Sequence, residues 1–70
     1  SSFVSFKLDR SVKGDFEVQV YDLQGKVVKQ GSYSANEHVE INIEDLKMGT
    51  YVLSVNGKNY KASAKFIKWN

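Results

Sequence analysis

The sequence predicts an all-β domain, a small antiparallel immunoglobulin-like β-sandwich of six to seven strands. Apolar residues recur at every second position along most of the chain, which is the period of a half-buried strand. Turn residues separate these segments at spacings of about 8–12 residues. The chain has 70 residues and a hydrophobic content of 41%. Such a chain can bury one thin core, so we expect a single domain.

The first two expected strands follow directly from this alternation. Residues 4–8 and 16–20 alternate between apolar and polar side chains, with a turn between them at residues 13–15. A second turn follows, with Asp22 at its first position and Gly25 at its last. That arrangement is typical of a type I turn.

The third and fourth strands flank a polar loop. Residues 26–33 predict the third strand, in which Gly31 suggests a bulge or bend. Residues 39–43 alternate cleanly and predict the fourth. Residues 44–47 then break the period, which predicts one turn of 3₁₀ helix that brings Leu46 to the core.

The last third of the chain predicts a hairpin. Gly49 frees the backbone for a sharp return into the fifth strand, and Asn56-Gly57 is the strongest hairpin signal in the sequence. The sixth strand follows, and we expect the chain to finish in it as ordered structure that a partner can reach. One face of this strand carries small or aromatic residues: Tyr60, Ala62, Ala64 and Phe66. The other face carries Lys61, Ser63, Lys65, Ile67 and Trp69.

Charge and composition exclude several classes of function. The net charge is only +2, which does not favour nucleic-acid binding. The basic residues are nevertheless concentrated, because residues 58–70 hold four lysines and no acidic residue. No apolar run approaches the ~20 residues that span a bilayer, so we expect no membrane span. The chain begins without methionine or a signal peptide, which suggests a domain excised from a longer protein.

The sequence offers little for catalysis or for metal binding. The chain has no cysteine, and its single histidine, His38, lies in a polar region beside Ser34 and Glu37 rather than in a separated triad. The aspartates lie near turns, and no calcium-loop or phosphate-loop spacing occurs. We therefore expect no enzyme, no metal and no cofactor.

Four short segments, taken in order, resemble the C-terminal sorting domain of proteins that the type IX secretion system of Bacteroidetes exports (the Por secretion system sorting domain). The first is Tyr21-Asp22-Leu23-Gln24-Gly25-Lys26 and the second is Ile41-Asn42-Ile43-Glu44-Asp45-Leu46. The third is Gly49-Thr50-Tyr51-Val52, and the last is Lys65-Phe66-Ile67-Lys68. The resemblance extends from about Phe16 to Lys68. Such domains commonly begin with a proline–asparagine–proline segment, and this chain has no proline, so its N-terminal boundary departs from the pattern.

The resemblance implies a non-catalytic signal. Residues 1–70 would form one C-terminal sorting domain that directs an N-terminal cargo through the periplasm and the outer-membrane translocon to the cell surface or the medium. A sortase-like peptidase commonly removes such domains. The residues that we expect the translocon to recognise are Lys65, Phe66, Ile67 and Lys68, by strand addition. The fold-defining residues are Tyr21, Asp22, Gly25, Leu46, Gly49 and Tyr51. An exposed edge strand also makes a homodimer plausible.

Two alternatives stay open at this point. The chain could be a structural immunoglobulin-like module of an extracellular protein, as in flagellar hook-cap proteins, which share the tyrosine–aspartate–x–x–glycine turn. It could also be a carbohydrate-binding accessory module, in which Trp69 and the tyrosines stack on sugars.

Overall fold

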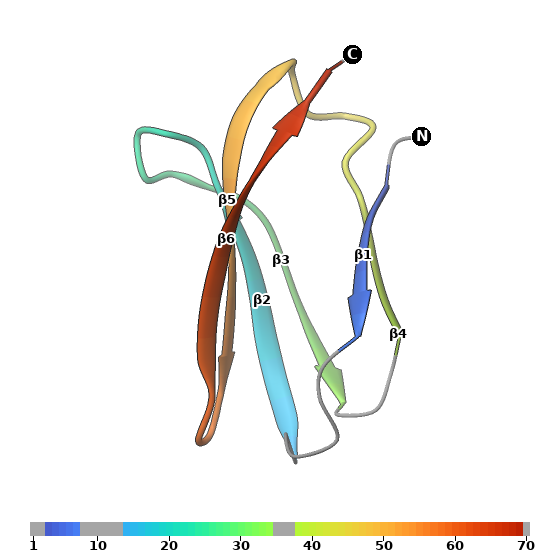
Figure 1. The fold of residues 1–70 in the computed structure, drawn as a ribbon, viewed down its shortest axis with the longest axis vertical. Coiled ribbons are helices and arrows are strands. Elements are labelled where there is room, and N and C mark those ends of the chain that lie inside the picture. The colour runs from blue at the N-terminus through green and yellow to red at the C-terminus, as the bar shows by residue number, and fades with distance from the viewer. Residues whose placement is uncertain (1–2, 8–13, 35–37, 70) are drawn as a thin grey trace.

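The computed structural model describes residues 3–7, 14–34 and 38–69. Within these ranges the chain forms two antiparallel sheets (Figure 1). The strands are β1 (Phe3–Lys7), β2 (Asp15–Tyr21), β3 (Val27–Ser34), β4 (His38–Asn42), β5 (Gly49–Gly57) and β6 (Lys61–Lys68). The predicted all-β fold class is therefore confirmed, with six strands in the described part of the chain.

The two sheets differ in width. The wider sheet has the strand order β3-β2-β5-β6, and the narrower one consists of β1 paired with β4. Figure 1 shows β1 and β4 together on one side of the molecule and the four other strands on the opposite side. Because side chains alternate along a strand, each sheet turns one apolar face toward the other.

The core lies between these two faces. In β2, Phe16, Val18 and Val20 are buried while Glu17 is exposed, as the alternation predicts. The buried apolar residues are Phe16, Val18, Val20, Val39, Ile41, Ile43, Tyr51 and Val55. They come from β2, β4, β5 and the segment after β4, so strands that are distant in sequence share one core.

The turn after β2 closes between the two predicted residues. The Gly25 amide donates to the Asp22 carbonyl over 3.0 Å, and Gly25 has a φ of 88°, a conformation that glycine adopts without a Cβ penalty. The Asp22 carboxylate also accepts from the amides of Gln24 and Lys26, both at 2.9 Å. One side chain thus satisfies two backbone donors that would otherwise depend on water.

This arrangement gives a first prediction. Replacing Asp22 by alanine should lower the free energy of unfolding by about 1–2 kcal/mol, because two amide donors lose their acceptor. Urea denaturation followed by circular dichroism measures the change. Gln24→Ala is the matched control, since Gln24 is exposed in the same turn and contributes only its backbone amide to these bonds. Equal effects of the two substitutions would contradict the role given to Asp22.

The irregularity in β3 lies three residues before the predicted one. The register shifts between Val20 and Tyr21, whose partners are Lys29 and Val27, so Val28 is the extra residue of a bulge. Gly31 instead pairs regularly with Val18. The prediction of a bulge at Gly31 is therefore wrong. A Cβ at this position would lie 3.2 Å from the ring of Tyr33, so a larger residue would require a small shift of that ring.

The segment after β4 is a turn rather than the predicted turn of 3₁₀ helix. The Leu46 amide donates to the Ile43 carbonyl over 3.0 Å, and this single bond closes the turn. Asn42 Oδ1 accepts from the Glu44 amide over 2.8 Å, so a side chain satisfies a backbone donor at the start of the turn. The expected burial of Leu46 against the core is confirmed.

The hairpin between β5 and β6 turns two residues later than predicted. Gly57 pairs with Phe16 of β2, so Asn56 and Gly57 belong to the strand. The Gly57 amide donates to the Tyr60 carbonyl over 2.7 Å, which leaves Lys58 and Asn59 as the loop. Pairing with the neighbouring strand therefore overrides the local turn signal.

Leu8 of the predicted first strand and Lys13 of the predicted turn lie outside the described residues.

Candidate functional site

The C-terminal strand β6 forms one edge of the wider sheet. Among the described strands it pairs only with β5. The pairing is antiparallel and regular over its whole length, from Asn56 opposite Lys61 to Gly49 opposite Lys68. An edge strand turns every second backbone N–H and C=O away from its neighbour, so it can accept a further strand.

Strand alternation divides the four predicted recognition residues into two pairs. Lys65 is exposed, and Ile67 is 55% exposed, which is high for a large apolar residue. Phe66 is half-buried and Lys68 is only 5% exposed. Lys65 and Ile67 thus form the outward pair, while Phe66 and Lys68 point toward the other sheet.

The side chain of Lys68 holds the turn that follows β4. Its ammonium donates to the carbonyl oxygens of Leu46 at 2.9 Å and of Glu44 at 3.3 Å. Lys68 is the one buried charged residue in the described part of the chain. Burying an ammonium is unfavourable unless acceptors replace its water, and the two carbonyls do so.

The inward pair of β6 also packs on the start of β5. The Phe66 ring stacks on Tyr51 with ring centroids 5.6 Å apart. The Tyr51 hydroxyl in turn donates to the Lys47 carbonyl over 2.6 Å. Gly49, which opens β5 opposite Lys68, has a φ of 156°. These contacts join the end of β6 to residues 44–51.

The structure brings the fold-defining residues together in two places, not one. Leu46, Gly49 and Tyr51 lie at the end of β6 described above. Tyr21, Asp22 and Gly25 belong to the β2–β3 turn, where the Tyr21 hydroxyl donates to Gln19 Oε1 over 2.6 Å. Tyr21 and Val52 are opposite each other in the sheet, and Val52 is opposite Lys65. The turn motif therefore lies at the same end of the sheet as the outward pair.

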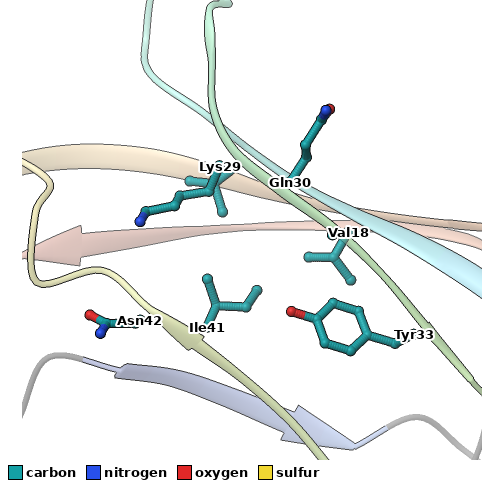
Figure 2. Close-up of a pocket in the computed structure, with 8 residues that line it drawn as sticks. Val18, Lys29, Gln30, Tyr33, Ile41 and Asn42 are labelled. Atoms are coloured by element: carbon teal, nitrogen blue, oxygen red, sulfur yellow. The ribbon is translucent and has the colours of Figure 1, made fainter.

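A cavity of about 200 Å³ opens on the other edge of the sandwich, between β3 and β4. Figure 2 shows Val18, Ile41 and Tyr33 directed into it, whereas Gln30 points away. Lys29 also lines this cavity, and its Nζ lies 2.7 Å from an Asp45 carboxylate oxygen. The hydrogen bond from Lys29 lowers the pKa of Asp45 from its ordinary value. The ion pair links β3 to the turn after β4.

The described residues contain no cluster of three or more histidine, cysteine, aspartate or glutamate side chains that could hold a metal. His38 lies 3.8 Å from a carboxylate oxygen of Glu40, and both side chains are exposed. No helix long and apolar enough to cross a membrane occurs in the part of the chain that the structure describes.

The structural role of Lys68 is the feature that sequence reasoning missed. The sequence did indicate that Lys68 points inward. Lys68 continues the alternate positions of Ala62, Ala64 and Phe66, which lie on one face of the strand. A lysine at an inward position must find acceptors inside the fold. Those acceptors belong to a turn more than twenty residues earlier, so the sequence could not identify them.

One comparison with known proteins identifies a family. The family model described as a secretion system C-terminal sorting domain matches residues 1–69, which is nearly the whole chain. Comparison with curated proteins and with solved structures gives no match.

Proposed function

This chain belongs to the C-terminal sorting domain family of type IX secretion, and we propose that its secretion machinery recognises the outward pair of β6, Lys65 and Ile67, together with the free edge of that strand. A domain of this family is a sorting signal and not a catalyst, and it directs an attached cargo to the cell surface or the extracellular space. Recognition must therefore use a surface, and β6 is the surface with the features of a docking strand.

The single observation that carries this proposal is the exposure pattern of β6. An isoleucine that remains 55% exposed beside an exposed lysine adds an apolar contact and a charge at one strand edge. Backbone pairing along an edge supplies affinity, and side chains at alternate positions supply specificity. The inward pair, Phe66 and Lys68, contributes by holding this edge in place.

The route and the partners belong to the same proposal. The cargo precedes the domain in the parent protein and crosses the periplasm before the translocon binds β6. A sortase-like peptidase then separates the cargo from the domain. The domain itself needs no catalytic residue for this, since its task is to be bound and then removed.

Export of a reporter tests the proposal. Residues 1–70 are fused behind a periplasmic reporter in a bacterium with a type IX system, and the reporter is measured on the surface, in the medium and in the periplasm. The double substitution Lys65→Glu with Ile67→Ser should lower export at least about tenfold, which corresponds to a loss of about 1.4 kcal/mol in recognition. The reporter should accumulate in the periplasm.

The matched control changes exposed residues at the opposite edge of the sheet. Gln30→Glu with Val27→Ser alters one polar and one apolar exposed side chain of β3. Export of this control should match that of the unmodified domain. Urea denaturation of both purified domains verifies that neither pair unfolds the sandwich, because exposed substitutions usually change stability by about 0.5 kcal/mol or less. Normal export of the β6 double variant would refute recognition through the outward pair.

A further inference from the structure

The burial of inward residues falls from β4 to β1 in the narrower sheet and toward β6 in the wider one. In β4 the inward residue Val39 is 0% exposed, whereas the inward residues of its neighbour β1, Val4 and Phe6, are only half-buried. The same gradient crosses the wider sheet. Val18 of β2 and the residue opposite it in β5, Val55, are buried, Leu53 of β5 is half-buried, and the next strand β6 is exposed at its inward centre.

The exposed inward positions of β6 are Ala62 and Ala64. The register places Ala62 opposite the buried Val55 and Ala64 opposite Leu53, so both methyl groups belong to the core face. Both residues are nevertheless exposed. These two alanines occupy consecutive inward positions of β6. Their small side chains leave space on the core face, which large side chains fill in the other strands of the sheet.

The outer face of the same strand is positively charged and unpaired. Lys61 and Lys65 are exposed there, and no ion pair involves either lysine within the described residues. Lys58 extends the charge into the adjoining loop. At this edge, therefore, small apolar residues on the inward side alternate with cations on the outward side.

We infer that the partner segment at β6 is an extended strand that alternates acidic and large apolar residues; this inference rests on the proposed function and specifies the chemistry of its partner. Residues opposite each other in paired strands have Cβ atoms about 4.5–5.5 Å apart. An incoming strand therefore places alternate side chains beside Lys61 and Lys65, where carboxylates fit. Its other side chains lie beside Ala62 and Ala64, where large apolar groups complete the core.

The same charges argue against a second copy of this chain as the occupant. Antiparallel pairing of β6 with another β6, centred on Ser63, places Lys61 of each copy opposite Lys65 of the other. Like charges directly opposite each other destabilise a strand pair. The carboxylates of an acidic strand would attract Lys61 and Lys65, whereas the lysines of a second copy would repel them. Charge complementarity therefore favours the acidic strand.

Binding of defined peptides tests this inference without the secretion system. Fluorescently labelled peptides of nine residues, alternating glutamate with leucine, are titrated against the purified 70-residue chain by anisotropy. One control alternates lysine with leucine and the other alternates glutamate with serine. The glutamate–leucine peptide should bind at least about tenfold more tightly than either control, and its advantage over the lysine–leucine control should shrink in high salt. Equal binding of the three peptides would overturn the inference.

Two substitutions locate the binding. Ala64→Phe fills the inward space and should weaken the glutamate–leucine peptide at least about tenfold, whereas Ser32→Phe, an exposed position on the opposite edge strand β3, should not. Lys65→Glu should weaken the glutamate–leucine peptide and strengthen the lysine–leucine peptide. That reversal of preference cannot result from unfolding. Two results would overturn the inference by placing the peptide elsewhere. In one, the Lys65→Glu chain prefers neither the glutamate–leucine nor the lysine–leucine peptide. In the other, the Ala64→Phe chain binds the glutamate–leucine peptide as tightly as the unmodified chain does.

Failure of this inference is distinguishable from failure of the proposed function. If the peptides show no preference while the outward double variant still blocks export, the machinery reads β6 by other chemistry, and the inference falls while the proposed function stands. If the peptides show the expected preference while the Lys65→Glu, Ile67→Ser double variant is exported normally, the proposed function falls.

Light scattering of the purified chain gives its oligomeric state, which should be monomeric. A dimer that excludes the peptide would overturn the inference by making a second copy the occupant.

Discussion

Replacement of Lys68 by alanine is expected to lower the free energy of unfolding by about 2–4 kcal/mol. The substitution removes the donor to the carbonyls of Glu44 and Leu46, and each of these part-buried hydrogen bonds to a charged group contributes about 1.5–3 kcal/mol. The packing of the lysine stem is lost as well. Urea denaturation followed by circular dichroism measures the change, and the slope of the transition shows whether the end of β6 detaches before the rest of the domain.

Two further variants separate the ammonium from the stem and from the strand. Lys68→Met keeps most of the apolar stem without the donor, so it should be intermediate in stability. Lys65→Met makes the same exchange at an exposed position of the same strand and should change stability by about 0.5 kcal/mol or less. If Lys68→Ala is as mild as Lys65→Met, the two carbonyl contacts do not hold the turn.

The Lys68→Met variant also discriminates between the two roles a terminal lysine can have. At a temperature where this variant remains folded, its reporter should still be exported, since its ammonium lies inside the fold in the unmodified domain. The outward double variant of Lys65 and Ile67 should show the opposite behaviour, with normal stability and blocked export. Blocked export by a fully folded Lys68→Met domain would mean that the machinery contacts the ammonium directly.

The second large effect is expected in the core. Phe16→Ala should cost about 3–5 kcal/mol, because Phe16 is 2% exposed and its ring stacks on Tyr33 with centroids 6.0 Å apart. A domain of this size has a total stability of roughly 4–10 kcal/mol. The loss is therefore a large part of what keeps the domain folded.

Near-ultraviolet circular dichroism and dispersion of amide proton resonances measure the expected loss of packing in Phe16→Ala. Phe3→Ala is the matched control, because Phe3 is an exposed phenylalanine on β1 and should cost far less. The comparison is informative because both residues are phenylalanines near the start of a strand, and only their burial differs. Similar losses in the two variants would contradict the assignment of the core to the space between β2 and β4.

Alternation in the sequence predicted the last strand and the division of its side chains between two faces, but not which face turns outward. The lysine–hydrophobe–hydrophobe–lysine segment suggested four contact residues, whereas the strand exposes only Lys65 and Ile67 to the outside. Because successive side chains of a strand point to opposite faces, Lys65 and Ile67 must lie on one face of β6, and Phe66 and Lys68 on the other. Which pair faces outward depends on the register with β5, in which Phe66 is opposite Tyr51.

Local patterns alone determined the strands and the β2–β3 turn. The alternation in β2 and β4, and the Asp22–Gly25 spacing, each act within a few residues, so the sequence predicted them correctly. Tertiary structure decided the rest. Pairing of Gly57 with Phe16 moved the hairpin turn beyond Asn56-Gly57, and two distant carbonyls converted Lys68 from a surface lysine into a buried donor. The physical reason is the same in both cases: these features depend on groups that only the folded chain brings into contact.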